Sequence, residues 1–531
     1  AIASVGLLSK RGGGVAVCLT NCRAAGAPIK EMLNRCAGLI PIAKLAESEA
    51  DYVDQQGTRD GACVVYTHAC HYDAPDLIDT KRENADEKVR LKTLSIGLVV
   101  PDIMYELAAR NKDIYLFCPY DIKRVYGIQM SKLNITKHYK ELVNNPEIRK
   151  RKVNARRYFQ TISFLQGQSG FPFIMNEDTV NRLNPLNGWI SMSNLCTEIL
   201  QPSWPSILGP DMSYVKVGRD ISCNLGSINA VNAMQHGPQF GDHVETAVRM
   251  LTAVSIKSTI GCVPSIDNGN KLGHAIGLGV MNLHGLFATE GLMYGSEASC
   301  ELTDLFYATL RFHAIRASCL IAKERGEYFD GFKESKYYTG EVFEPYVERD
   351  WCDISPEVAD ILIRNGFSIP TADDWAELKT LVHEHGMFNQ NLLATAPTGS
   401  ISYVNNSTAS IAPIVERIES RKEGLLGRCY YPAPHMTNEN AHLYKDAYEL
   451  GYKAVIDVYA AATPHVDQGL SCTLYFLKEF TTTATLDEAR NYAWEKGLKT
   501  TYYMRIRSED NDDFSTLAAN QNIKECLACA V

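Results

Sequence analysis

The stretch near the C-terminus limits the fold more than any other part of the chain, because it reads as a strand, a helix and a second strand. Residues 470–476 (LSCTLYF) form an apolar, strand-like run. Thr485 and Glu488 have the spacing of a capping box, which predicts the start of a helix, and Gly497 predicts its end. The second strand is expected at residues 499–506. Two strands joined through a helix pair in parallel, so this stretch predicts a parallel crossover.

The same alternation elsewhere predicts an α/β fold with a buried parallel sheet. Residues 15–20 (VAVCLT) follow three glycines and form a short apolar run, which is typical of a buried strand. Between Trp375 and Val382 the apolar side chains share one helix face, and Gly386 lies just past the expected helix end. Helices that alternate with apolar strands are the pattern of an α/β architecture.

Composition and charge exclude several classes of protein. The chain has 531 residues, of which 45% are hydrophobic and 22% charged, so disorder is excluded as its overall state. Its formal net charge of −9 argues against binding a nucleic acid polymer through a broad basic face. It has no run of about 18 apolar residues, so we expect no membrane span. Sixteen cysteines are too few for a disulfide scaffold, and they predict reduced thiols in the cytoplasm.

The first residues, AIASVGLLSK, read as the second half of an apolar helix. A domain seldom begins inside a core helix. We therefore expect the natural protein to continue upstream of Ala1.

Residues 193–198 (SNLCTE) carry the most suggestive chemistry. Asn194, Cys196 and Glu198 occupy alternate positions, so in an extended segment their side chains would point the same way. A thiol between an amide and a carboxylate suits hydrogen abstraction with proton transfer. The alternative is an ordinary strand with a polar outer face.

The chain ends in a second thiol motif, Cys526-Leu-Ala-Cys529, after the polar, acidic segment 508–525. We interpret residues 508–531 as a flexible redox tail, and residues 1–507 as the catalytic part. Two thiols two residues apart can close a disulfide and carry electrons to a buried site. The alternative is an unremarkable frayed end.

A loop of small residues, 396–400 (APTGS), could hold a diphosphate. Its backbone N–H groups and hydroxyls from Thr398 to Ser400 are suited to phosphate oxygens, above all at a helix start. A plain turn is equally compatible with Pro397 and Gly399. Cys223 is a further thiol, which by itself reads as a small buried hydrophobe.

Three other features have both an ordinary and a chemical interpretation. Cys63, His68, Cys70 and His71 look like metal ligands, but strand geometry puts them on opposite faces, and we expect no metal. Residues 79–90 are rich in both charges, which indicates a solvated helix face or an effector-responsive loop. Tyr502 and Tyr503 suit a strand, but could relay an electron and a proton if a local irregularity brings their rings together.

In order along the chain, these segments resemble the large catalytic subunit of class I ribonucleotide reductase. The resemblance covers essentially the whole chain. Its motifs are SNLCTE (193–198), DISCNLGSIN (220–229), HAIGLGVMNLHG (274–285), APTGSIS (396–402), ATPHVDQGLS (462–471), KTTYYMRIR (499–507) and the terminal CLAC. Residues 10–21 (KRGGGVAVCLTN), 79–95 (DTKRENADEKVRLKTLS) and the tail are most similar to class Ib.

The resemblance implies a reaction and the residues that perform it. Ribonucleoside diphosphates would be reduced to 2′-deoxyribonucleoside diphosphates. Cys196 would carry a thiyl radical that takes the 3′ hydrogen of the ribose. Asn194 and Glu198 would orient the substrate and move protons, with Glu198 as the base at the 3′ hydroxyl. Cys223 would be one of the two thiols that reduce the 2′ carbon.

The resemblance also implies the substrate-binding, radical-transfer and effector residues. Ser193, Asn194 and Glu198 would contact the substrate, Gly14 would lie near its ribose, and Ala396, Pro397, Thr398, Gly399 and Ser400 would hold its diphosphate. Tyr502 and Tyr503 would pass the radical to Cys196, and Cys526 with Cys529 would re-reduce the active site. Cys22 and Arg23, like the loop from Lys81 to Thr93, would sense a bound deoxynucleotide or ATP effector.

The implied fold is a ten-stranded α/β barrel with a central finger loop that carries the radical cysteine. The implied partners are a small subunit that generates the radical at a dimanganese or diiron site, a glutaredoxin-like or thioredoxin-like reductant, and a second large subunit in a homodimer. No metal or cofactor would bind this chain directly.

The resemblance implies that the partner thiol of Cys223 lies on a first barrel strand upstream of Ala1, so we expect this strand to be missing from the 531 residues. We therefore expect no repeated turnover from these 531 residues alone. An alternative is a truncated or split-subunit fragment that binds nucleotides or the small subunit without turnover. The cobalamin-dependent relative of the family is disfavoured, because a radical made at the site needs no tyrosine relay.

Overall fold

The computed structural model describes residues 2–53, 61–423 and 427–507. The chain divides into two compact units. Of the described residues, the first unit contains those up to Arg182, Trp189–Leu200 and residues 473–507. The second contains Leu183–Gly188 and Gln201–Cys472.

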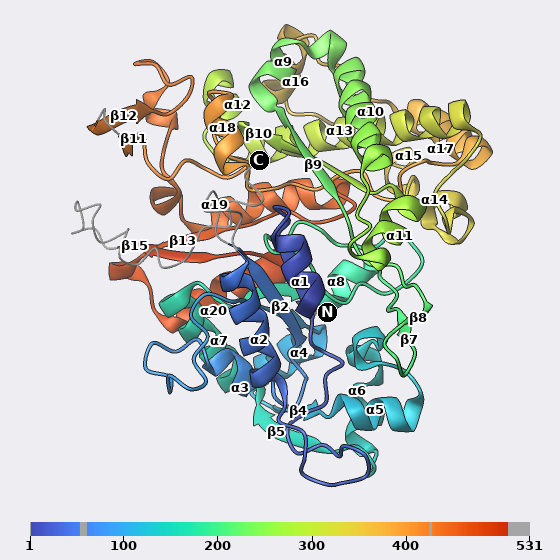
Figure 1. The fold of residues 1–531 in the computed structure, drawn as a ribbon. Helices are drawn as coiled ribbons and strands as arrows, with labels where there is room; N and C mark the ends of the chain where they lie inside the picture. The colour runs from blue at the N-terminus through green and yellow to red at the C-terminus, as the bar shows by residue number, and fades with distance from the viewer. Residues whose placement is uncertain (1, 54–60, 424–426, 508–531) are drawn as a thin grey trace. The chain divides into compact units, whose positions relative to one another are not determined.

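The first unit alternates strands and helices for most of its length (Figure 1). Its strands are β1 (Val15–Cys18), β2 (Cys63–His68), β3 (Ser95–Val100), β4 (Asp113–Phe117), β5 (Lys150–Asn154), β6 (Phe173–Asn176), β13 (Leu474–Leu477), β14 (Thr500–Thr501) and β15 (Met504–Arg507). Its helices are α1 (Ile2–Ser9), α2 (Leu39–Tyr52), α3 (Ala74–Asp79), α4 (Asp102–Ala109), α5 (Pro119–Tyr126), α6 (Ile135–Asn144), α7 (Ala155–Ser169), α8 (Glu177–Arg182) and α20 (Thr483–Glu495).

A five-stranded sheet in the order β1-β2-β3-β6-β14 organises the first unit. The first four strands run parallel, and β14 joins the edge of β6 antiparallel. Every residue of β2, β3 and β6 is buried, which explains why these strands are apolar runs rather than alternating patterns. The strand predicted at residues 15–20 is confirmed as β1.

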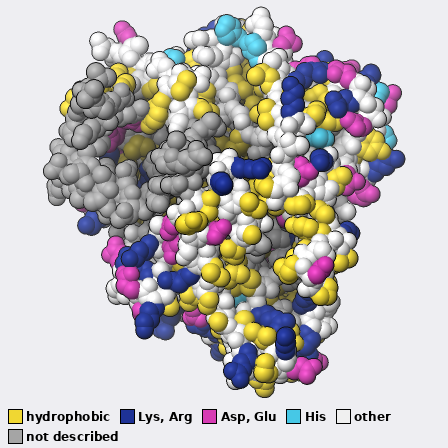
Figure 2. Space-filling model, viewed as in Figure 1, with side chains coloured by type: hydrophobic (Ala, Val, Ile, Leu, Met, Phe, Trp, Pro, Cys, Tyr) yellow, Lys and Arg dark blue, Asp and Glu magenta, His cyan; other side chains and the backbone are white. Residues whose placement is uncertain are grey.

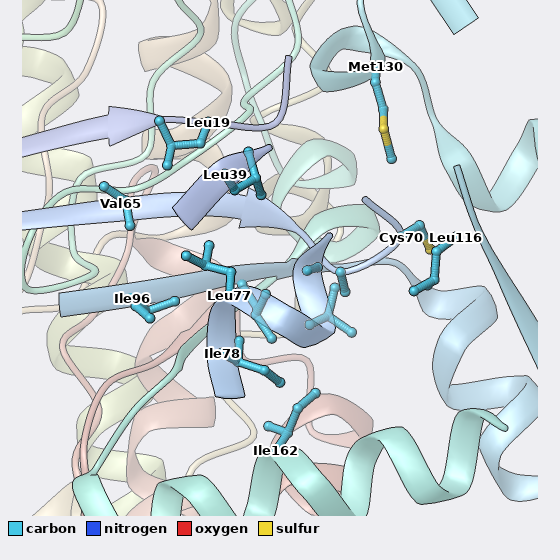
Figure 3. Close-up of a cluster of buried hydrophobic side chains, with 14 of the residues drawn as sticks. Leu19, Leu39, Val65, Cys70, Leu77, Ile78, Ile96, Leu116, Met130 and Ile162 are labelled. Carbon is cyan, nitrogen blue, oxygen red and sulfur yellow. The ribbon is translucent and has the colours of Figure 1, made fainter. Parts of the chain in front are cut away.

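The core of this unit fills the space between the sheet and helices α2, α3 and α7. Figure 3 shows Val65 of β2 and Ile96 of β3 facing the side chains of Leu77 and Ile78 on α3, with Ile162 of α7 beyond them. All five side chains are almost completely excluded from solvent.

The crossover predicted near the C-terminus is confirmed, with changes at its ends. Strands β13 and β15 pair in parallel, and α20 connects them. The predicted cap was wrong: Thr482 caps the helix, and its hydroxyl accepts from the Thr485 N–H at 3.2 Å. The Thr485 hydroxyl acts in place of a glutamate by accepting from the Thr482 N–H, so the cap lies three residues earlier.

Where one strand was predicted at residues 499–506, the structure has two short strands, β14 and β15. β14 pairs with β6, whereas β15 pairs with β13. The chain therefore changes partner between Thr501 and Met504, and Tyr502 and Tyr503 lie in the interruption.

The second unit is mainly helical. Its helices are α9 (Ala230–Gln235), α10 (Phe240–Lys257), α11 (Pro264–Gly273), α12 (Leu283–Glu290), α13 (Glu297–Arg325), α14 (Lys336–Thr339), α15 (Glu344–Val347), α16 (Pro356–Arg364), α17 (Ala372–His385), α18 (Gly399–Val404) and α19 (Ala447–Ala462). Its strands are β7 (Ile207–Leu208), β8 (Tyr214–Lys216), β9 (Asn224–Asn229), β10 (Ile276–Met281), β11 (Ile418–Glu423) and β12 (Gly427–Pro432).

Parallel pairing also occurs in the second unit. β9 and β10 pair in parallel over six residues, and single parallel bridges link Leu278 to Leu393 and Thr395 to Leu470. The predicted helix with Trp375 on its buried face is confirmed as α17, which ends before Gly386.

The α/β class with parallel strands is thus confirmed. In the described residues the ladder hydrogen bonds form one five-stranded sheet and five two-stranded sheets rather than one closed barrel. None of the helices in the described ranges is both long and apolar enough to cross a lipid bilayer. On the face seen in Figure 2, basic and acidic side chains are interspersed over the described residues.

Candidate functional site

The loop that carries Cys196 is a buried turn of the first unit. The expected extended segment was wrong: the turn spans Leu195–Thr197, and Thr197 has a left-handed φ of 71°. A reversal at Thr197 means that the side chains of Asn194, Cys196 and Glu198 do not follow strand alternation. A β-branched residue in this conformation is strained by about 1–3 kcal/mol, so neighbouring contacts must hold it.

Hydrogen bonds within the loop and from β14 hold the turn. The Ser193 hydroxyl donates to the Ile199 carbonyl at 2.9 Å, and the Asn194 side-chain oxygen accepts from the Ile199 N–H at 3.0 Å. From outside the loop, the Thr500 hydroxyl donates to the Thr197 carbonyl at 3.0 Å. Thr500 thus fixes the strained residue directly.

Tyr66 holds the other side of the loop. Tyr66 lies near the centre of β2, and its hydroxyl donates a hydrogen bond to the Asn194 carbonyl at 2.9 Å. Burial raises the pKa of Tyr66 well above its ordinary value, and nearby Glu198 and Cys196 raise it further. Tyr66 therefore stays protonated and remains a donor.

Cys196 is buried, with only 1% of its surface exposed. The Tyr502 hydroxyl donates to its sulfur at 3.4 Å. Glu198, two residues along, is also completely buried. A thiol, a phenol and a carboxylate therefore lie in one region of the first unit that excludes bulk water.

The rings of Tyr502 and Tyr503 lie together, with centroids 4.1 Å apart and planes tilted by 53°. The local irregularity required for this contact exists, because both residues occupy the gap between β14 and β15. Phe173 contacts both tyrosine rings, at 4.6 and 4.9 Å, and Phe171 contacts Tyr503 at 5.5 Å. The tyrosine pair thus lies in an aromatic cluster that shields it from solvent.

Cys223 belongs to the second unit, where it immediately precedes β9. It is half-buried, and the Gln468 amide donates to its sulfur at 3.7 Å. The same amide group donates to the Ile276 carbonyl of β10 at 3.0 Å. Gln468 therefore fixes the thiol against the β9–β10 pair.

The small-residue loop 396–400 is both a turn and a helix start. Thr398 has a φ of 52°, and α18 begins at the next residue, Gly399. The Thr398 hydroxyl accepts from the Ser410 N–H at 2.7 Å, which ties the loop to a later segment. Diphosphate binding at Ala396, Pro397, Thr398, Gly399 and Ser400 stays a prediction.

The residues predicted to bind ribose and effector also lie in the first unit. Gly14 is exposed directly before β1. The Arg23 guanidinium stacks over Tyr120, 4.6 Å from its ring centroid. Burial, together with the neighbouring Cys18 and Cys36 thiols, raises the pKa of Cys22 to about 11. The Cys22 side chain therefore remains a neutral thiol, and its carbonyl accepts from a His71 ring nitrogen at 3.0 Å.

Cys63, His68, Cys70 and His71 are the residues that look like metal ligands in the sequence. Within the described part of the chain, no group of three or more Cys, His, Asp or Glu residues is placed to hold a metal ion. His68 instead forms a buried 3.1 Å pair with Glu177, and its other ring nitrogen lies 2.9 Å from the backbone nitrogen of Cys70. Cys526 and Cys529 lie outside the described residues.

Sequence reasoning missed the residues that support the site, namely Tyr66, Thr500, Phe171 and Phe173. Only Tyr66 carried a usable signal. It is the one aromatic residue in β2, and Gly97 lies opposite it in the register of β3.

A buried thiol that contacts a tyrosine pair within an aromatic cluster is suited to one-electron chemistry on sulfur. An α/β fold with such a site is compatible with the class of oxidoreductases. The comparisons with known proteins identify the family. The chain matches the sequence profile described as "Ribonucleotide reductase, barrel domain" over residues 1–504, and it belongs to this family.

Curated relatives agree with this assignment. The chain is 45% identical to the ribonucleoside-diphosphate reductase subunit alpha of Mycoplasma pneumoniae, over 99% of this chain and 73% of the relative. It is 40% identical to the protein of the same name from Bacillus subtilis, again over 99% of this chain and 73% of the relative.

Proposed function

We propose that this protein is the catalytic subunit of a ribonucleoside-diphosphate reductase, and that it supplies 2′-deoxyribonucleoside diphosphates for DNA synthesis. The observation that carries the proposal is the contact between the Tyr502 hydroxyl and the sulfur of the buried Cys196. A hydrogen atom can pass along this contact from sulfur to a tyrosyl oxygen, which leaves a thiyl radical and restores the phenol.

The proposed reaction balances through two further thiols. The Cys196 radical removes the 3′ hydrogen of the ribose, and the 2′ hydroxyl leaves as water after protonation. Two thiols supply two electrons and two protons and end as a disulfide, and Cys196 then returns the 3′ hydrogen. Cys223 is proposed as one of these thiols, and Glu198 as the base at the 3′ hydroxyl.

The family resemblance supplies the residues that we assign to substrate recognition. We propose that Ala396, Pro397, Thr398, Gly399 and Ser400 hold the diphosphate. Gly14, Ser193 and Asn194 would contact the sugar. The helix start at Gly399 supports the diphosphate assignment, because backbone N–H groups at such a position are available to anions.

The radical is proposed to come from a small subunit with a dimanganese or diiron site, as in class Ib. Both relatives are named "subunit alpha", which supports a partner subunit. Tyr502 and Tyr503 would receive the radical. Cys526 and Cys529 would re-reduce the disulfide and exchange with a glutaredoxin-like or thioredoxin-like protein.

The finer architecture and regulation follow the family resemblance. We propose a ten-stranded barrel with the Cys196 turn as its finger loop, a homodimer of large subunits and a cytoplasmic location. Deoxynucleotide or ATP effectors would act at the loop of Cys22 and Arg23. No observation favours the alternative of a fragment that only binds nucleotides or the small subunit.

The test is a diphosphate-reduction assay with the natural full-length polypeptide, a radical-bearing small subunit and a dithiol reductant. We expect deoxynucleotide formation by the wild type, none by Cys196→Ser, and wild-type rates for Cys352→Ser, which changes an exposed thiol. Product formation by Cys196→Ser would contradict the proposal.

A further inference from the structure

Lys81 is an unusual lysine, because it is buried. It follows α3 and begins the charged segment 81–93, yet only 6% of its surface is exposed. Lysine is almost never buried without a partner, since removing its charge from water is unfavourable. The contacts of this ammonium group therefore need a physical account.

Two contacts offset the free-energy cost of burying the Lys81 ammonium group. Its nitrogen lies 4.5 Å from the centroid of the Phe171 ring, in cation–π geometry. It also donates to the Lys92 carbonyl at 3.3 Å, near the far end of the same segment. Burial lowers the pKa of Lys81 to about 8, with Glu47 raising it and Arg90 lowering it, so the group is still mostly charged at neutral pH.

Phe171 connects this lysine to the tyrosine pair. Its ring meets the Tyr503 ring edge-on at 5.5 Å and the Phe173 ring at 5.0 Å. The residue before it, Gly170, has a φ of 76°, and a Cβ there would lie 3.1 Å from the Tyr503 ring. Tyr503 therefore has little freedom on the side where Phe171 approaches it.

We propose that Lys81 is a positioning residue for radical transfer: its ammonium group fixes the Phe171 ring, and this ring sets the orientation of Tyr503 against Tyr502. The segment 81–93 is thereby connected to the radical path, because the ammonium group also ties Lys81 to Lys92. Lys81 itself gains or loses no electron. This inference depends on the proposed function, since it assumes that Tyr503 carries a radical.

The test compares two substitutions at the same position in the complete enzyme with its small subunit. Lys81→Met keeps the length of the side chain but removes the charge, and Lys81→Arg keeps a cation over the ring. We expect Lys81→Met to lower kcat about tenfold with little change in the KM for the diphosphate. Lys81→Arg should restore most of the lost rate.

Arg325, at the end of α13, provides a control with the same kind of contact. Its guanidinium lies 5.0 Å from the ring centroid of Phe388. We expect Arg325→Met to keep the wild-type kcat, because Phe388 makes no ring contact with the tyrosine pair among the described residues.

A spectroscopic measurement separates positioning from general stability. With 3-aminotyrosine at position 503, the radical trapped there is counted by electron paramagnetic resonance. The trapped fraction should fall in Lys81→Met and recover in Lys81→Arg. If Lys81→Met does not fold, Phe171→Leu replaces it, since it removes the ring and keeps the lysine, and the trapped fraction should fall in the same way.

Failure of this inference and failure of the proposed function look different. An active wild type, an inactive Cys196→Ser and an unchanged trapped fraction in Lys81→Met or Phe171→Leu would overturn only the role of Lys81. Equal losses in Lys81→Met and Lys81→Arg would also overturn it, because the charge would then not matter. Product formation by Cys196→Ser would overturn the proposed function itself.

Discussion

The Tyr502 hydroxyl donates a hydrogen bond to the Cys196 sulfur across 3.4 Å, although 306 residues separate the two in the chain. The turn that presents Cys196 and the strand interruption that presents Tyr502 are both irregular. Two departures from regular structure therefore meet at one hydrogen bond. Such irregularities persist when the surrounding structure fixes them, and they concentrate at functional sites.

Removing the Tyr502 oxygen tests this contact. In Tyr502→Phe the ring still packs against Phe173, but no hydroxyl remains to exchange a hydrogen atom with Cys196. We expect loss of diphosphate reduction, while the free energy of unfolding falls by only about 1 kcal/mol for the lost hydrogen bond. Turnover and urea denaturation measure the two effects separately.

Tyr158→Phe is the control for this substitution. Tyr158 is also buried, and its hydroxyl donates to the Ala69 carbonyl at 3.3 Å, well away from Cys196 in the chain. It should lose similar stability and keep its turnover. Comparable turnover in the two variants would contradict a role for the Tyr502 oxygen.

The hydrogen bond from Thr500 to the Thr197 carbonyl should be essential for the shape of the turn. Thr500→Val removes the donor and keeps the volume, so the strained Thr197 loses its support. We expect a loss of about 1–2 kcal/mol in the free energy of unfolding and a lower kcat.

Thr501→Val is a close control, because it is the adjacent residue of β14 and is also buried. The Thr501 hydroxyl makes no hydrogen bond within the described ranges. Valine there should be neutral or slightly stabilising. If both variants behave alike, the Thr500 hydrogen bond does not support the turn.

The sequence predicted those parts of the fold that depend on local patterns. The strand at Val15 and the helix at Trp375 follow from apolar spacing and flanking glycines, and both are present. The contact between Tyr502 and Tyr503 was predicted only for the case that the strand is interrupted, because a regular strand would point the two rings to opposite faces.

The supporting contacts could not be predicted, because they join distant segments. Tyr66 reaches the carbonyl of a residue 128 positions away, and no periodicity encodes such a pairing. The left-handed conformation of Thr197 was also hidden, since threonine is not a residue that normally marks a turn of this kind. Alternation therefore predicted a strand at Asn194–Glu198 where tertiary contacts impose a turn.

Gly97 should be required for the position of Tyr66. The two residues are register partners in adjacent parallel strands, and a Cβ on Gly97 would overlap the Tyr66 ring. Since the ring cannot move without releasing the Asn194 carbonyl, we expect Gly97→Ala to cost about 1–3 kcal/mol of stability and to lower turnover.

Gly261→Ala is the control for Gly97→Ala, because a Cβ at Gly261 has open space around it. It should change neither stability nor turnover. Wild-type turnover in Gly97→Ala would show that the Tyr66 ring does not control the turn at Cys196.

The buried pair of His68 and Glu177 should make stability depend on pH. Burial alone would lower the pKa of His68, but the charge of Glu177 and hydrogen bonds outweigh it and raise the pKa from 6.5 to about 10. A raised folded-state pKa means that the stabilisation is fully present below about pH 6.5 and is lost as the pH rises toward about 10. In Glu177→Gln, which removes the partner charge, we expect a loss of about 3 kcal/mol near neutral pH. Urea denaturation between about pH 6 and about pH 9 should show this loss shrinking as the pH rises.

An exposed pair with the same chemistry provides the comparison. His138 and Glu141 lie 3.2 Å apart with 38% and 56% of their side chains exposed. Because solvent screens this pair, Glu141→Gln should change stability by less than about 1 kcal/mol. A Glu177→Gln effect that is equally small, or one that grows with pH, would mean that His68 is neutral in the folded protein. The stabilisation would then come from packing around the ring rather than from its charge.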